Sequence, residues 1–406
     1  MSSSFDPSWV HRGRVPCLDG YRAIGALLVV FAHSTKCAPN PIPVPVGLYR
    51  TIHWGVLAVN LFFVLSGFLI TLLLLREVRA RGCISLRSFY LRRLLRLLPA
   101  AAAFFVVLFI LQWARAVSVS GRDWFAALTY TINFHEGACW ELGHFWSLSI
   151  EEHFYLVWPV MLAILGLTGG KWALALCILL GPVARYLSHA YWSDYETLIW
   201  TFNYVDIIAF GAGLAFLCQS EKFHNLMARV QPICGSLLIL VCLGLVGSAW
   251  LENRSGKYEI LAHRTVTGFL CAALIYLSAG FCNKWVRRVL DWPPLVAIGV
   301  VSYSIYVWQQ LFTGKSSLPE LFSSWPTNLI FIAIAVILSY YLIERPFMRI
   351  KEQAGSKKTS HSGTPPAEPV CGRQLPPLHE PSGLQPQVDP SAAGFYLVRR
   401  LASEAE

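Results

Sequence analysis

The sequence has little charge for its length. Only 14% of its 406 residues are Asp, Glu, Lys or Arg, whereas 55% are hydrophobic, and the mean hydropathy is +0.51. Apolar runs of about 20 residues, each long enough to cross a bilayer as a helix, recur along most of the chain. The scarcity of charge therefore excludes a water-soluble globular protein and indicates one that crosses a membrane several times.

Motifs for metal or redox chemistry are missing as well. The eleven cysteines form no CxxC pair and no Cys/His spacing of a zinc site, and their odd number argues against a framework of disulfides. We expect most of them to pack as small apolar side chains, and we expect neither a metal nor a permanently bound cofactor. The net charge of +10 does not predict nucleic-acid binding, because cytoplasmic loops and anionic headgroups account for such a charge in a membrane protein.

Apolar runs are what the sequence has in abundance. The N-terminus lacks a compact signal peptide with a small-residue cleavage site, so we expect the run from Ala23 onward to be a retained span. Breaks at Pro, Gly and charged residues divide the chain into ten predicted spans, near residues 21–38, 54–75, 97–114, 144–166, 172–190, 197–218, 231–251, 264–282, 293–313 and 326–345. The predicted fold class is therefore all-α, a polytopic membrane helix bundle of about ten transmembrane helices.

Arginines set the predicted orientation of this bundle. The segment 76–96 carries seven arginines against one acid, Glu77, which marks it as cytoplasmic and places both termini in the cytoplasm. We divide the chain into an N-terminal cytoplasmic segment, 1–15, a membrane domain, 16–350, and a cytoplasmic tail, 351–406. The tail is rich in Pro, Ser, Gly and Gln and is expected to be disordered, because it cannot bury enough apolar surface to offset its ordering entropy.

One predicted span carries polar side chains on a single face. Residues three and four apart share a face of a helix, which places four side chains of the fourth span in one column: His144, Ser147, Glu151 and Tyr155. A short carboxylate two turns inside a span cannot snorkel to the surface, so Glu151 or its neighbour Glu152 should have a partner in the bundle. The candidate partners are His33, Arg22 and His153, and an ion pair that only joins two helices is the competing interpretation.

The first span holds a second pair of ionisable groups. Arg22 and His33 are eleven residues apart, close to three helical turns, and so share a face. Ionisable groups in a span cost roughly 2.5 to 3.5 kcal/mol each, so they usually face a cavity and mark a site. Either residue alone could instead lie at an interface, with Arg22 snorkelling to the headgroups and His33 ending the helix. A carboxylate such as Glu151 beside an imidazole would make it a general base.

A basic helix is predicted between residues 86 and 99. It places Arg92, Arg93 and Arg96 on one side and leucines on the other. The planar guanidinium suits phosphate oxygens, but a surface that lies on anionic lipid and sets the topology explains the same pattern. The residues by themselves leave both interpretations open.

Six landmarks, taken together and in order, resemble the acyltransferase-3 family of bacterial integral-membrane O-acyltransferases over residues 16–350. They are Leu18–Ala23 with His33, Asn60–Thr71, Phe89–Pro99, Gly143–Glu152, Ser302–Tyr306 and Ile343–Pro346. The resemblance implies about ten membrane helices and transfer of an acyl group, usually acetyl, from acyl-CoA to a hydroxyl of a cell-envelope or exported carbohydrate, such as lipopolysaccharide. It also implies a multi-pass protein of the cell (inner) membrane.

The resemblance also implies roles for named residues. His33, Glu151 and Arg22 would be catalytic, with Arg22 and His33 the essential pair and Glu151 orienting or charge-balancing the imidazole. The phosphates of CoA would be bound by Arg92, Arg93 and Arg96. Substrate contacts would come from Asp19, His144, Ser147 and Tyr155. Whether His33 acts as a base or carries the acyl group itself stays open.

The chain departs from the family pattern at four positions. Asn60 stands where Asp is common, His153 where Gln is usual, Gln309 where His often occurs, and Tyr204 where Arg often precedes the aspartate. The acceptor therefore stays open between a carbohydrate and a lipid-linked glycan, while acyl-CoA and membrane lipids are the other expected partners. From the buried charges alone, the alternatives are a multi-pass proton-coupled transporter, which would need no CoA, and a noncatalytic membrane scaffold.

Overall fold

The computed structural model describes residues 15–36, 53–192, 199–281 and 284–349, all within one compact unit, Phe5–Gln374. Within these ranges every regular element is a helix, so the all-α prediction is confirmed. The predicted tail, 351–406, and almost all of the predicted N-terminal segment, 1–15, lie outside the described residues.

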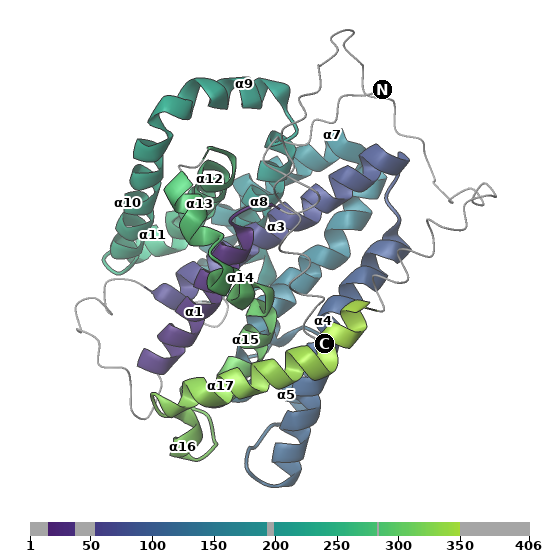
Figure 1. The fold of residues 1–406 in the computed structure, drawn as a ribbon, viewed down its shortest axis with the longest axis vertical. Coiled ribbons are helices and arrows are strands. Elements are labelled where there is room, and N and C mark those ends of the chain that lie inside the picture. The colour runs from purple at the N-terminus through teal and green to yellow at the C-terminus, as the bar shows by residue number, and fades with distance from the viewer. Residues whose placement is uncertain (1–14, 37–52, 193–198, 282–283, 350–406) are drawn as a thin grey trace, which may run out of the picture. The chain divides into compact units, whose positions relative to one another are not determined.

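Figure 1 shows the helices in chain order, from α1 in purple to α17 in yellow-green. The long helices are α1 (Leu18–Lys36), α3 (Trp54–Arg81), α4 (Leu86–Trp113), α7 (Phe145–Trp192), α10 (Cys234–Glu252) and α12 (Arg264–Phe281). Shorter α-helices are α5 (Gly121–Leu128), α6 (Trp140–Gly143), α8 (Val205–Leu217), α9 (Glu221–Val230), α11 (Gly256–Tyr258), α13 (Lys284–Leu290), α14 (Pro293–Val300), α15 (Ser302–Gln309), α16 (Glu320–Ser323) and α17 (Thr327–Leu338). The remaining helical turns are η1 (Ile132–Phe134), η3 (Thr201–Asn203), η4 (Gln231–Ile233), η5 (Glu259–His263), η6 (Gln310–Phe312) and η7 (Ser339–Glu344).

Several of these helices are suited to a membrane. Among the described residues, six helical stretches are long and apolar enough to span it: Trp54–Arg81, Leu86–Trp113, Trp140–Trp192, Glu221–Glu252, Gly256–Gly280 and Thr327–Arg349. A bent pair, α14 with α15 and η6, makes a seventh candidate. Each of the ten predicted segments falls at least partly on a helix. The number ten and the cytoplasmic placement of both termini stay predictions.

The fourth and fifth predicted spans lie in one element, α7. This 48-residue helix contains a non-helical residue, Gly166, with φ 69° and ψ −178°. Only glycine adopts such a conformation without steric cost, so the chain bends here rather than continuing straight. The polar half of α7, before the bend, is the half that reaches the site.

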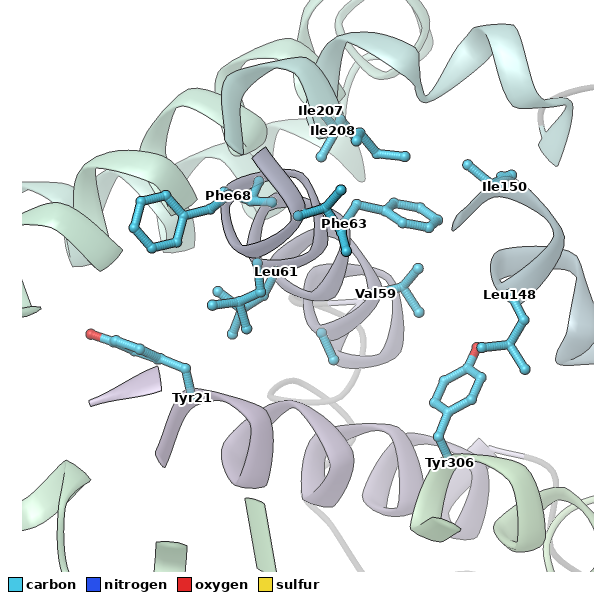
Figure 2. Packing of buried hydrophobic residues seen from close by; sticks show 14 of the residues in the cluster. Tyr21, Val59, Leu61, Phe63, Phe68, Leu148, Ile150, Ile207, Ile208 and Tyr306 are labelled. Atoms are coloured by element: carbon cyan, nitrogen blue, oxygen red, sulfur yellow. The ribbon is translucent and has the colours of Figure 1, made fainter. Parts of the chain in front are cut away.

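Helix α3 lies at the centre of the bundle. Figure 2 shows it with Ile207 and Ile208 of α8 on one side and Tyr21 of α1 on the other. Its approach to α8 is close because two glycines meet the opposite backbone: a Cβ at Gly67 would lie 2.1 Å from the Ile208 carbonyl oxygen, and one at Gly211 would lie 2.0 Å from that of Val64. Small residues at helix crossings allow this packing without a strong hydrophobic force between helices.

A buried ion pair outside the cavity joins α7 to α8. Arg185 of α7 contacts both carboxylate oxygens of Asp206 at 2.9 and 3.0 Å, and both side chains are fully buried. Thr265 donates to the same carboxylate at 2.6 Å, and the Asn203 carbonyl accepts from Arg185 at 3.0 Å. Because these charges are paired and hydrogen-bonded, Asp206 joins neighbouring helices rather than supplying chemistry.

Candidate active site

A cavity of about 370 Å³ lies between α1, α3, α4, α7 and α15. Its charged lining is unbalanced. Among the described residues that line it there are four guanidinium groups, Arg22, Arg76, Arg93 and Arg96, and one carboxylate, Glu151, which gives four minus one, or a formal charge of +3. Such a cavity favours an anionic ligand.

The basic part of α4 turns its charges inward. Arg93 and Arg96 line the cavity, while Leu91, Leu94 and Leu98 on the same helix are about half exposed. This is the reverse of a soluble amphipathic helix, and it fits a bundle whose outer surface meets lipid and whose interior holds a polar ligand.

Arg92 does not share this arrangement. Its side chain is 45% exposed and donates to the Glu77 carboxylate at 3.2 Å, outside the cavity lining. The sequence grouped Arg92 with Arg93 and Arg96, and the structure separates it from them. Arg76 of α3 lines the cavity with Arg93 and Arg96 in place of Arg92. From the sequence, Arg76 was counted only among the charges of the cytoplasmic loop.

Glu151 is held by hydroxyl groups. Ser66 of α3 donates to one carboxylate oxygen at 2.7 Å, and Tyr155, one turn further along α7, donates to the other at 3.1 Å. The Tyr155 ring in turn lies under Arg93, whose guanidinium carbon is 3.8 Å from the ring centroid. The positive charges of Arg93 and Arg22 also act on Glu151. These contacts make Glu151 the internal counter-charge of the arginines.

Three members of the predicted helical column line the cavity. Ser147, Glu151 and Tyr155 lie there together, as helical periodicity predicts. His144 is absent from the lining, and its ring is buried against Phe104, Phe145 and Tyr306.

The first helix contributes Arg22 and its neighbour Asp19. The two side chains lie 4.0 Å apart, and Arg22 reaches the cavity. Asp19 is thus a partner of Arg22, whereas the sequence placed it among the substrate contacts. That role stays a prediction.

His33 lies beyond the cavity, and its described hydrogen bond is to Gln309. The His33 Nδ1 and Gln309 Oε1 atoms are 2.8 Å apart, and the ring meets Trp140 edge-on with centroids 5.5 Å apart. The predicted contact between His33 and Glu151 is not among the described hydrogen bonds, since Glu151 is bonded to Ser66 and Tyr155. An amide occupies the place where we expected a carboxylate.

The surroundings of Gln309 assign the protons of this pair. Thr313 donates to the same Oε1 at 3.2 Å, and the Gln309 amide nitrogen donates to Gln310 at 3.2 Å. The network thus makes Oε1 the acceptor, so the proton in the bond belongs to His33 Nδ1. This leaves Nε2 of His33 as the basic nitrogen.

The sequence assigned no role in the site to four of its residues. Ser66 and Tyr306 stand within the landmark segments, Arg76 was counted only in the arginine segment, and Gln309 was noted only as a departure from the family pattern. No local pattern marks them, because each becomes part of the site through a contact with another helix.

Comparison with known proteins agrees with these landmarks. Residues 15–344 match the acyltransferase-3 family, described as an acyltransferase domain. A Staphylococcus aureus (strain COL) protein named "Putative O-acetyltransferase" is 30% identical over 371 residues, covering 82% of this chain and 57% of the relative. No solved structure matches.

Two further relatives are named for a substrate. The "Putative peptidoglycan O-acetyltransferase" of Bacillus subtilis (strain 168) is 27% identical over 367 residues, covering 83% of this chain and 55% of the relative. The "Peptidoglycan O-acetyltransferase" of Listeria monocytogenes is 28% identical over 379 residues, covering 83% and 56%. The chain thus spans little more than half the length of these relatives.

Proposed function

The chain belongs to the acyltransferase-3 family of membrane O-acyltransferases, and from this premise we propose that it moves an acetyl group from acetyl-CoA to a hydroxyl of a cell-envelope or exported carbohydrate. We also place it in the cell membrane with the arginine end of its cavity toward the cytoplasm. Three relatives named as O-acetyltransferases, two of them for peptidoglycan, support this proposal.

The positive charge of the cavity is the observation that supports acetyl-CoA as the acyl donor. CoA has a diphosphate and a 3′-phosphate, and guanidinium groups bind phosphate oxygens through two parallel hydrogen bonds. Arg76, Arg93 and Arg96 line the cavity, and its one carboxylate, Glu151, already accepts two hydroxyl donors. The net positive charge of the lining therefore favours the phosphates.

His33 is proposed to act on the acceptor hydroxyl. Its Nε2 takes the hydroxyl proton as the oxygen bonds to the thioester carbonyl carbon; the carbon–sulfur bond then breaks, and the thiolate takes up the proton. In the covalent variant, Nε2 bonds to the acyl carbon as the carbon–sulfur bond breaks and CoA leaves as its thiolate; the hydroxyl oxygen then bonds to the acyl carbon, the nitrogen–carbon bond breaks, and the hydroxyl proton passes through the freed Nε2 to the thiolate. Gln309 serves both routes, because its acceptor keeps the proton on Nδ1.

Arg22 and Glu151 have a different role in this account. Arg22 lines the cavity beside Glu151, and neither residue is described as bonded to His33. We assign them to charge balance around the donor: Glu151 keeps the arginines ordered when CoA is absent, and Arg22 offsets Glu151 when CoA is bound. The acceptor is a carbohydrate or lipid-linked glycan that approaches from the other end.

Two measurements test the function. Protein in lipid nanodiscs is given acetyl-CoA labelled in its acetyl group together with peptidoglycan glycan strands, and label is expected in the glycan with release of one CoA per acetyl. Mass spectrometry of envelope polysaccharides from a strain lacking this gene should show one acetyl increment lost. Proton-coupled flux in proteoliposomes without any acyl transfer would overturn the proposal in favour of a transporter.

A further inference from the structure

The cavity ends before it reaches His33. On α1, Arg22 lines it, but His33, eleven residues later, is absent from the described lining. On α7, Tyr155 lies under Arg93 and donates to Glu151, whereas Ser147, one turn nearer the start of the helix than Glu151, is hydrogen-bonded to Tyr306 of α15. The arginines thus lie beside Tyr155 and Glu151, and Ser147 contacts the helix that carries the partner of His33.

Helix α15 shows how short the separation is. Tyr306 lines the cavity, and Gln309, three residues further, contacts His33. Three residues of helix rise about 4.5 Å, so less than one turn lies between the end of the cavity and the partner of the imidazole.

The barrier between them is a pair of hydroxyl groups. Ser147 Oγ and Tyr306 Oη are hydrogen-bonded, and both also approach the His144 carbonyl oxygen, at 3.2 and 3.3 Å. The Tyr306 ring meets Phe62 edge-on with centroids 6.2 Å apart. In Figure 2 the Tyr306 ring reaches from α15 toward Leu148 of α7. This bridge joins the two helices across the end of the cavity.

We propose that Tyr306 controls access to His33: its hydroxyl bond to Ser147 closes the cavity, and the ring must move aside before a thioester can meet the imidazole. The inference rests on the proposed function, in which the arginines hold the phosphates of the donor. A thioester that extends away from the arginines meets Tyr306 before it meets His33.

The elements around Tyr306 allow such a movement. Helix α15 has only eight residues and is joined to α14 through Val301 with a bend of 58°. Because Gln309 lies on the same short helix, a shift that withdraws Tyr306 also moves the hydrogen-bond partner of His33. Opening of the cavity and placement of the imidazole are thereby coupled.

Closure has a chemical use. A thioester held beside a basic imidazole is open to attack by water: the water oxygen bonds to the acyl carbon, the carbon–sulfur bond breaks, and the proton passes through His33 to the thiolate, giving acetate and CoA. Keeping bound acetyl-CoA apart from His33 until Tyr306 moves suppresses this loss.

Removal of the two hydroxyls tests the proposal. Tyr306→Phe keeps the ring but removes its bonds to Ser147 and to the His144 carbonyl, whereas Ser147→Ala removes only the first of these, so each variant weakens closure by at least one hydrogen bond. Each should raise hydrolysis of acetyl-CoA without acceptor by about two- to tenfold, the population change expected for one such bond. In Tyr306→Phe combined with His33→Ala the extra hydrolysis should disappear. Tyr90→Phe is the matched control, because that hydroxyl also joins two helices, donating to the Leu156 carbonyl at 2.7 Å outside the cavity.

Two results would count against the proposal. Hydrolysis by both single variants equal to that of Tyr90→Phe would show that no closure exists, and a rise that survives His33→Ala would show that Tyr306 does not guard the imidazole. CoA binding, measured by titration calorimetry on each variant, confirms folding. Absence of CoA binding to the unmodified protein would instead overturn the proposed function, and this inference with it.

Discussion

The His33 imidazole is hydrogen-bonded through Nδ1 to the Oε1 atom of Gln309, at 2.8 Å. A neutral amide here, in place of a carboxylate, fixes the tautomer of the ring without adding a negative charge beside it. The arginine cavity and the imidazole are therefore served by different partners: Glu151 balances the cavity, and Gln309 positions the base.

Replacement of Gln309 should separate positioning from binding. Gln309→Leu removes the acceptor for Nδ1, so the ring can adopt the wrong tautomer, and we expect kcat to fall roughly tenfold to a hundredfold, as for other lost orienting partners of imidazoles. KM for acetyl-CoA should stay unchanged. Steady-state kinetics in nanodiscs measures both. Gln309→Glu should recover part of the rate, because a carboxylate accepts the same bond; equal losses in both variants would point to a structural role only.

The arginines should differ in their effect on CoA. Arg93→Gln or Arg96→Gln removes a charge from the cavity and should raise the Kd for CoA by about tenfold or more, since a charged hydrogen bond contributes roughly 1.5 to 3 kcal/mol. Arg92→Gln is the matched control and should change Kd less than about twofold, because Arg92 pairs with Glu77 outside the cavity. Equal effects at all three positions, measured by titration calorimetry, would contradict the geometry.

Glu151→Gln should act on stability and binding in opposite directions. It removes the counter-charge of Arg22 and Arg93, so the folded protein without ligand should unfold at a lower temperature. The cavity gains positive charge, so CoA should bind at least as tightly as before. Thermal unfolding and calorimetry measure the two effects. Weaker CoA binding by this variant would show that Glu151 contacts the donor directly.

Asp123 should make the loop after α4 sensitive to acid. Burial raises the pKa of this carboxyl, but hydrogen bonds from Ser120, His135 and the Cys139 backbone outweigh it and hold the pKa below its ordinary value of 3.8. A lowered folded pKa means that the stabilisation is complete above the unfolded pKa and is lost as pH falls through the folded one. The protection of residues 120–139 against hydrogen exchange, taken relative to the intrinsic amide rate at each pH, should therefore be constant from pH 7 to 5 and decrease below about pH 4. Asp123→Asn should have low protection at every pH; an acid-induced loss of protection as large as in the unmodified protein would assign the effect to another group.

Local periodicity predicted the parts of the site that lie on one helix. Ser147, Glu151 and Tyr155 recur at intervals of four, and all three face the cavity. His144, one turn before Ser147, is absent from the lining, because its ring packs against Phe104, Phe145 and Tyr306. Periodicity also could not tell which of Arg92, Arg93 and Arg96 face the cavity, because residues three and four apart share one face of a helix. Arg92 is drawn away by Glu77 on another helix, to which it donates.

Contacts between distant helices could not be predicted. Ser66 and Glu151 are 85 residues apart, and His33 and Gln309 are 276 apart. The need for a partner at Glu151 followed from the cost of burying a charge, but its identity depends on how α3 crosses α7. The helical class thus follows from composition and pattern, whereas the inward direction of Arg93 and Arg96 and the assignment of Gln309, and not Glu151, to His33 require the packed structure.

The most direct test of the central claim is the structure of this protein with CoA bound in a lipid nanodisc. The account predicts phosphate oxygens about 2.7 to 3.2 Å from the guanidinium groups of Arg76, Arg93 and Arg96, with the sulfur of CoA directed toward Tyr306. Phosphates bound elsewhere, with the arginine cavity empty, would contradict it.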